Sequence, residues 1–172
     1  MLRKNIGFVT QDVFVFSDTL RNKVLFGRPD VPEEELEAAF RAADMFEDIK
    51  EFENGLDTPL GERGITLSGG QRQRLTIARA LISDPPILIL DDALSMVDTR
   101  TEERILNRIL RLRRQKTNLI VSHRVSTVSR TDRTVVLEQG EIVEIGNHKS
   151  LLEQRGLYAS LYERQILEQE LE

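Results

Sequence analysis

The sequence predicts an α/β fold in which a parallel sheet is flanked by helices. Residues 87–90 form a short apolar run without alternation, as expected for a parallel strand that is covered on both faces. Residues 119–122 form a second apolar run, and a helical pattern separates the two. Because such sheets bind ligands at the carboxyl ends of their strands, functional residues are expected just after these runs.

The composition limits the classes of function. The chain has 172 residues, which is enough for one domain with a sizeable core. A formal net charge of -5 argues against nucleic acid as the main partner, and the absence of cysteine excludes disulfides and thiolate metal sites. No apolar run approaches the ~20 residues that span a bilayer, and the start of the chain does not resemble a secretory signal. The chain is therefore expected neither to cross a membrane nor to be exported.

The first part of the chain predicts one strand followed by helices. Residues 5–10 form the strand, and residues 17–19 supply the polar start of a first helix. A second helix is expected from Glu33, because three glutamates occupy its first turn, where the helix dipole favours acids. Apolar residues at helical spacing mark the inner faces of this helix and the next: Leu36, Ala39, Phe40, Ala43, Met45, Ile49 and Phe52. Residues 56–66 are expected to form a loop.

The second part of the chain alternates helices with strands. Residues 71–82 predict a helix that Ser83, Asp84 and two prolines end. Residues 101–114 predict another, whose arginines form a solvated face. Residues 134–145 read as a hairpin around Gln139-Gly140, and apolar and tyrosine residues from 151 to 162 indicate closing helices. The inward residues of the two helices are expected to be Leu75, Ala78 and Leu81, then Ile105, Ile109 and Leu112.

Two neighbouring features suggest nucleoside triphosphate chemistry. The segment Leu67-Ser68-Gly69-Gly70-Gln71 places paired glycines at the N-terminus of a helix. Backbone N–H groups there can bind an anion without a Cβ in the way. Asp91 and Asp92 follow a buried strand and could hold a metal ion or a water beside that anion. Alternatively, the glycines could simply begin a helix and the two aspartates could cap the next one.

The motifs together resemble a known family. Gln11, residues 67–71, residues 87–92, residues 95–98 and His123 resemble, in this order, the Q-loop, signature, Walker B, D-loop and H-loop of an ABC transporter nucleotide-binding domain. The resemblance covers essentially the whole chain. It implies a P-loop NTPase-like (RecA-like) parallel sheet with an inserted ABC α-helical subdomain. The implied segments are about 1–16 for the Q-loop strand and following loop, 17–82 for the helical subdomain with the signature, 83–150 for Walker B to the H-loop and hairpin, and 151–172 for the C-terminal helices.

The resemblance also implies a role for each matching residue. Asp92 occupies the position of the base that polarises the attacking water, His123 that of the residue bonding the γ-phosphate, and Asp91 that of a Mg²⁺ ligand. Gln11 resembles the residue that reaches Mg²⁺ and the water. The signature residues Leu67, Ser68, Gly69, Gly70 and Gln71 would contact ATP on a partner domain, and Asp98 would couple the two sites of the dimer. Transmembrane-domain coupling is implied for a segment typical of exporters, made of Gly61, Glu62, Arg63 and Gly64.

Two departures from the family pattern affect the expected activity. No Gly-x-x-x-x-Gly-Lys-[Ser/Thr] motif occurs, so the Walker A loop and the N-terminal strands are expected to precede Met1, and the chain alone is expected to bind ATP weakly or not at all. Asp92 replaces the usual glutamate and is one methylene shorter. Such segments recur in exporter halves with a degenerate site, which favours a heterodimer. Smaller departures are Thr10, where proline is usual, and Met96, where a small residue is usual.

The resulting prediction is an ATP-hydrolysing segment of an ABC exporter that uses ATP and Mg²⁺ to move a small molecule, drug or lipid. Its expected partners are a second nucleotide-binding domain and the transmembrane domains, at the cytoplasmic side of the cell (inner) membrane. Two alternatives remain: a catalytically silent half-site that only completes a partner's site, and a non-transport ABC ATPase.

Overall fold

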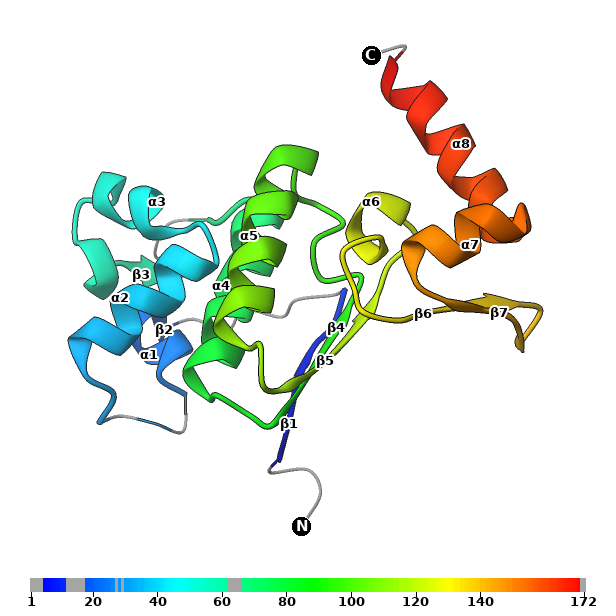
Figure 1. Ribbon diagram of the computed structural model, residues 1–172. Coiled ribbons are helices and arrows are strands. Elements are labelled where there is room, and N and C mark those ends of the chain that lie inside the picture. Colours follow the sequence, from blue (N-terminus) through cyan, green and yellow to red (C-terminus); the bar gives the residue numbers. More distant parts are fainter. Residues whose placement is uncertain (1–4, 12–17, 27, 29, 62–65, 171–172) are drawn as a thin grey trace. The chain divides into compact units, whose positions relative to one another are not determined.

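The chain divides into two units, Met1–Ile120 and Val121–Glu172 (Figure 1). The computed structural model describes residues 5–11, 18–26, 28, 30–61 and 66–170. Each unit has its own cluster of buried apolar residues.

A parallel sheet organises the first unit. Its strand order is β1-β4-β5, and β1 runs parallel to β4, with Ile6 opposite Ile87 and Val9 opposite Leu90. The predicted fold class is therefore confirmed. The strands and helices of this unit are β1 (Ile6–Val9), β2 (Asp18–Thr19), α1 (Leu20–Val24), α2 (Glu33–Ala42), α3 (Phe46–Glu51), the 3₁₀ helix η2 (Gly55–Asp57), β3 (Pro59–Leu60), α4 (Gly69–Ile82), β4 (Ile87–Asp91), α5 (Thr99–Leu112) and β5 (Thr117–Val121).

A short strand, paired with a distant segment of the chain, lies where the sequence predicts only a loop. The 3₁₀ helix η2 and the short strand β3 occupy part of residues 56–66, and β3 pairs antiparallel with β2. Thr19 ends β2 and also caps α1, since its hydroxyl oxygen accepts a hydrogen bond from the Asn22 N–H at 3.2 Å. Two-residue strands carry little sequence signal, which explains why periodicity does not reveal this pairing.

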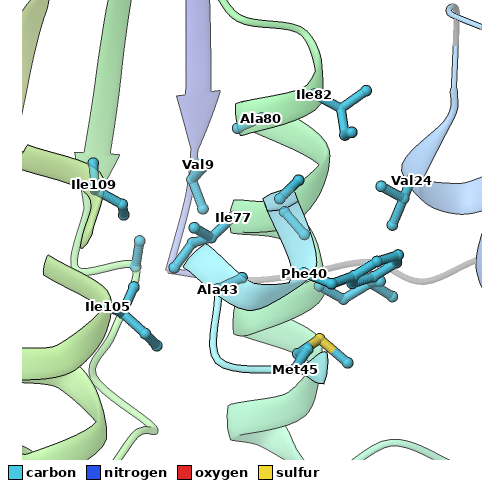
Figure 2. Packing of buried hydrophobic residues seen from close by; sticks show 14 of the residues in the cluster. Val9, Val24, Phe40, Ala43, Met45, Ile77, Ala80, Ile82, Ile105 and Ile109 are labelled. Atoms are coloured by element: carbon cyan, nitrogen blue, oxygen red, sulfur yellow. The ribbon is translucent and has the colours of Figure 1, made fainter. Parts of the chain in front are cut away.

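One apolar core joins the sheet to the helices of the first unit. Figure 2 shows side chains of α1, α2, α4 and α5 gathered around Val9 of β1. Phe40 of α2 and Ile77 of α4 are buried there, and α2 and α4 pack against each other. The core therefore fixes α4, which follows Ser68, against the strands that precede Gln11 and Asp92.

Three sequence predictions about α4 and α5 need correction. On α4, Leu75 and Ala78 are buried as predicted, but Leu81 is only partly buried, and the buried face also includes Ile77 and Ile82. Leu112 is 62% exposed because it is the last residue of α5, where the helix leaves the core. The arginine face is not fully solvated, since Arg113 is buried.

Arg113 joins the turn before β4 to the start of β5. Its guanidinium donates hydrogen bonds to the Asn118 side-chain oxygen at 2.8 Å and to the Pro85 carbonyl at 2.7 Å. A weaker contact of 3.4 Å reaches the carboxylate of Asp84. Burial lowers the pKa of Arg113, and Asp84 opposes that shift. These bonds set the spacing at which the two strands begin, because Thr117 also donates to the Pro86 carbonyl.

The second unit consists of a hairpin and helices, and its core joins Val136 of the hairpin to Val125, Leu151 and Tyr158. Its elements are α6 (Val125–Val128), β6 (Thr134–Glu138), β7 (Glu141–Gly146), α7 (His148–Gln154) and α8 (Leu157–Glu170). The hairpin is antiparallel and turns at Gln139 and Gly140, both at positive φ, as the sequence predicts. His148 begins α7, and its Nδ1 lies 2.8 Å from the hydroxyl of the buried Tyr158.

Within the described ranges, the structure contains no helix of the length and apolar character needed to cross a bilayer.

Replacing Arg113 with methionine is expected to lower the free energy of unfolding by about 2–4 kcal/mol. The substitution keeps the buried length but leaves the Pro85 carbonyl and the Asn118 amide without their donor. Arg114→Met is the matched control, because Arg114 is exposed, and it should change stability by no more than about 0.5 kcal/mol. Urea unfolding of both variants measures the difference, and equal midpoints would contradict the role given to Arg113.

Candidate functional site

A reciprocal pair of hydrogen bonds begins α4. The Ser68 hydroxyl oxygen accepts from the Gln71 N–H at 3.2 Å, and the Gln71 side-chain oxygen accepts from the Ser68 N–H at 2.9 Å. This is a capping box. It satisfies the Gln71 N–H, whereas the N–H groups of the first two helical residues, Gly69 and Gly70, have no partner within a helix. An anion at this position would meet both the N–H groups and the positive end of the helix dipole.

The two glycines face the turn that follows β4. A Cβ built on Gly70 would lie 2.9 Å from the carbonyl oxygen of Met96, and one built on Gly69 would lie 2.6 Å from its sulfur. The absence of side chains is therefore a packing requirement within the chain. Ser68, Gly69 and Gly70 also line one open pocket together with Arg74, Met96, Val97, Asp98 and Thr101.

The predicted residues of the carboxylate side reach the same edge of the sheet. Asp91 is the last residue of β4, and Asp92 follows it with a φ of 45°, in the left-handed region. Val9 pairs with Leu90 in parallel register, so Gln11 leaves β1 at the level at which Asp92 leaves β4. Asp91 and Asp92 are partly exposed and Gln11 is exposed. The hard oxygen atoms of these three residues fit the preference of Mg²⁺ for carboxylate, carbonyl and water ligands.

The described residues contain no cluster of three or more histidine, aspartate or glutamate side chains that could hold a metal by themselves. Mg²⁺ in proteins commonly takes one or two carboxylates together with phosphate oxygens and water. His123 lies two residues after the end of β5. It belongs to the second unit and is exposed. Gly61 follows β3 with a φ of 105°, whereas Glu62, Arg63 and Gly64 lie outside the described residues.

An aspartate–arginine cluster connects the start of α4 with α5. Asp48 of α3 accepts from the Gln71 side chain at 2.8 Å and from Arg74 at 2.9 Å. Asp44 accepts from Arg104 at 2.7 Å and from Arg108 at 2.6 Å, both on α5. Burial alone would raise the pKa of Asp44, but the bonds from the two arginines outweigh it and hold that pKa below its ordinary value.

Asp98 begins the helix that these arginines belong to. Its carboxylate accepts from the Thr101 N–H at 3.0 Å and caps α5, and this hydrogen bond lowers the pKa of Asp98. Arg104 contacts the Thr101 hydroxyl at 2.6 Å. Asp98, Arg104 and Asp44 therefore form a continuous polar connection from the start of α5 to the loop between α2 and α3.

This cluster and a buried glutamine, Gln73, are not among the functional residues that the sequence predicts. Gln73 is fully buried on α4, and its amide bonds to the turn after β4. The available signal is its spacing: Gln73 lies four residues before the buried Ile77, so a polar residue occupies the apolar face of the helix. Asp44 and Asp48 offer no comparable signal, because their partners lie far away in the sequence.

Comparison with known proteins identifies the family. The model of the family described as ABC transporter matches residues 1–95, which is more than half of the chain. The chain belongs to the ABC transporter family. This confirms the family that the motifs indicate.

The similar proteins are ATP-dependent flippases and exporters. The ATP-dependent lipid A-core flippase of Escherichia coli (strain K12) is 46% identical over 166 residues, which are 96% of this chain and 28% of that protein. The ATP-dependent lipid A-core flippase 1 of Colwellia psychrerythraea is also 46% identical, over 96% of the chain and 27% of that protein. A solved structure of a bacterial Atm1-family ABC exporter with ATP bound matches with a TM-score of 0.89 and 41% identity, over 96% of the chain and 29% of the exporter chain. The chain therefore spans less than a third of the length of these proteins.

Replacing Gly70 with alanine is expected to lower the free energy of unfolding by about 1–3 kcal/mol, because the new methyl group would meet the backbone carbonyl of Met96. Gly69→Ala is the matched comparison and should have a smaller effect, since it meets the movable end of the Met96 side chain. Adding Met96→Ala should relieve Gly69→Ala and leave Gly70→Ala unrelieved. Urea unfolding of the four variants measures this pattern, and relief of both glycine variants would contradict the packing described.

Asp44 is expected to make stability depend on pH at the acid end. Its pKa is lower in the folded chain than the ordinary value of 3.8, so its contribution is complete above that value and is lost as the pH falls through the folded pKa. The unfolding free energy of the native chain should therefore fall more steeply below about pH 4 than that of Asp44→Asn. Asparagine also tolerates the positive φ of this position, so the backbone is preserved. Parallel curves for the two proteins would contradict the ion-pair effect.

Proposed function

We propose that the 172 residues act as an ATP-hydrolysing segment of an ABC exporter, which couples hydrolysis to the transport of a lipid or another small molecule. The observation that carries the proposal is the arrangement around α4: a glycine-bearing helix start packs directly on the turn between Asp92 and Asp98. The similar proteins are named as flippases and exporters, which supports transport over a non-transport ATPase. The corresponding location is the cytoplasmic side of the membrane that holds the transmembrane domains.

The two sides of the arrangement suit two different nucleotides. Ser68, Gly69 and Gly70 present a hydroxyl and two N–H groups at a helix start, which suits ATP held by a second nucleotide-binding domain. Asp91, Asp92 and Gln11 lie at the carboxyl edge of the sheet, where the chain's own nucleotide is expected. His123 belongs to the second unit, and the family resemblance assigns to it a hydrogen bond to the γ-phosphate. The function then requires a dimer.

In this proposal each residue has a limited chemical task. Asp91 helps to hold Mg²⁺, which supplies charge neutralisation at the phosphates when it is bound. Asp92 accepts a hydrogen bond from the attacking water and orients it toward the γ-phosphate, and Gln11 holds the same water from the β1 side. The Ser68 hydroxyl donates a hydrogen bond to phosphate, since its oxygen serves as the acceptor in the cap.

A silent half-site is the second candidate, and Asp92 is the observation that favours it. Its carboxylate falls about 1.5 Å short of the position that a glutamate would reach, and a displacement of that size can reduce a rate by ~10²-fold. In that case this chain would complete the catalytic site of a different partner through its signature, and the working exporter would be a heterodimer.

One segment exchange tests both candidates. The 172 residues replace the matching segment of the Escherichia coli lipid A-core flippase, and the purified protein is assayed for Mg²⁺-dependent ATPase activity. Ser68→Ala should lower that activity at least ~10-fold, because it removes the phosphate donor and the helix cap. Ser83→Ala is the matched control at the opposite end of α4 and should leave the rate unchanged. Activity that does not depend on Ser68 would overturn the proposed function.

The same preparation separates the candidates through Asp92. If Asp92 is a weak base, Asp92→Glu should raise the rate by up to ~10²-fold. An unchanged rate with Ser68 dependence retained would refute the silent half-site and keep the exporter ATPase.

A further inference from the structure

Gln73 is a completely buried polar side chain on α4, two residues beyond Gln71. A buried amide is stable only when its donors and acceptors are paired. The Gln73 Nε2 donates to the Ser95 hydroxyl oxygen at 3.0 Å, and the Gln73 Oε1 accepts from the Met96 N–H at 2.9 Å. A longer contact of 3.5 Å joins Nε2 to the carbonyl of Asp92. Each of these partners belongs to the turn after β4, so the amide serves that turn.

The same turn contacts the helix start a second time. The Cβ directions of Gly69 and Gly70 point at Met96, which also donates its N–H to Gln73. Met96 therefore contacts both the glycines and the Gln73 amide. A movement of the first turn of α4 would change both contacts together, because neither the glycine backbone nor a buried amide has room to adjust independently.

The turn controls the direction of a carboxylate. Asp92 has a φ of 45°, and the turn closes with a hydrogen bond of 3.1 Å from the Ser95 N–H to the Asp92 carbonyl. A non-glycine residue keeps such a backbone conformation only where its surroundings enforce it. Gln73 contacts both ends of this turn, the Asp92 carbonyl and the Ser95 hydroxyl. Its buried side chain therefore holds Asp92 in this backbone conformation.

We propose that Gln73 is a positioning residue that links nucleotide bound at Ser68, Gly69 and Gly70 to the orientation of Asp92. The inference rests on the proposed function for the identity of the nucleotide. Nucleotide binding at the helix start restricts the first turn of α4. Through its hydrogen bonds, the Gln73 amide then restricts the turn after β4. As a result, the Asp92 carboxylate stays oriented toward the attacking water. The link acts in both directions, as thermodynamic coupling between two sites requires.

The first test uses the 172-residue chain alone and does not depend on ATP. Gln73→Met keeps the length of the side chain and removes both hydrogen bonds. The Met96 amide should then exchange with solvent at least ~10-fold faster than in the native chain, because it loses its acceptor. Thr76→Val is the matched control, since Thr76 is also buried on α4 but bonds only to its own helix, through the Arg72 carbonyl. Unchanged Met96 exchange in Gln73→Met would overturn the proposal.

The second test uses the flippase that carries these residues. Gln73→Met should lower kcat for ATP hydrolysis at least ~10-fold and change KM by less than ~2-fold. ATP still binds, but the Asp92 carboxylate is no longer oriented toward the attacking water. A non-hydrolysable ATP analogue with Mg²⁺ should slow the exchange of residues 93–97 in the native protein and in Thr76→Val, but not in Gln73→Met. A similar loss of kcat in Thr76→Val, or retained nucleotide protection in Gln73→Met, would overturn the link.

Two further results distinguish failure of the Gln73 proposal from misfolding of the variant and from failure of the proposed function. If Gln73→Met does not fold, Gln73→Glu keeps an acceptor for the Met96 N–H and replaces the amide donor with a carboxylate oxygen, and it should lower kcat at least ~3-fold. Native values in that variant would overturn the proposal. If the flippase that carries the native 172 residues shows no Ser68-dependent ATPase activity, the proposed function fails. The rate of hydrogen exchange at the Met96 amide in the 172-residue chain still decides whether Gln73 holds the turn.

Discussion

The capping box between Ser68 and Gln71 is the interaction on which the candidate site depends. It fixes where α4 begins, and with it the direction of the two N–H groups that follow Ser68. Gln71 takes part in the cap with its side-chain oxygen and uses its side-chain nitrogen to reach Asp48 of α3. The start of the helix is therefore determined both locally and by a tertiary contact, as expected for a site that must hold its geometry before a ligand arrives.

Three structural features that the candidate site depends on lie along helix α4. Its first turn carries the glycines, its buried face carries Gln73 and the apolar residues of the core, and its end precedes the turn that Arg113 secures. A polar cluster runs alongside it from Asp48 through Arg74 to Asp44 and then to the arginines of α5. Such clusters contribute geometry more than stability, since the desolvation of charged groups offsets much of their attraction.

The sequence predicts the sheet and the position of the motifs because both depend on local patterns. An unbroken apolar run at 87–90 is sufficient to predict a buried parallel strand, and Asp91 then follows at its carboxyl end. Ser95 and Met96, which bond to Gln73, and Pro85, which bonds to Arg113, lie more than 20 residues away from these side chains in the sequence, so no local period reveals the contacts. Leu112 shows the opposite error: helical spacing predicts burial, but the helix ends beyond the core.

The positive φ of Asp92 has a consequence for how this position can change during evolution. Aspartate is enriched in the left-handed region and glutamate is not, because the short carboxylate can bond to the nearby backbone. A longer acid at this position would gain reach toward a water but would lose conformational preference in the turn. In this chain the position therefore carries a trade-off between the reach of the acid and the folding preference of the turn that presents it. Aspartate at this position gives priority to the shape of the loop.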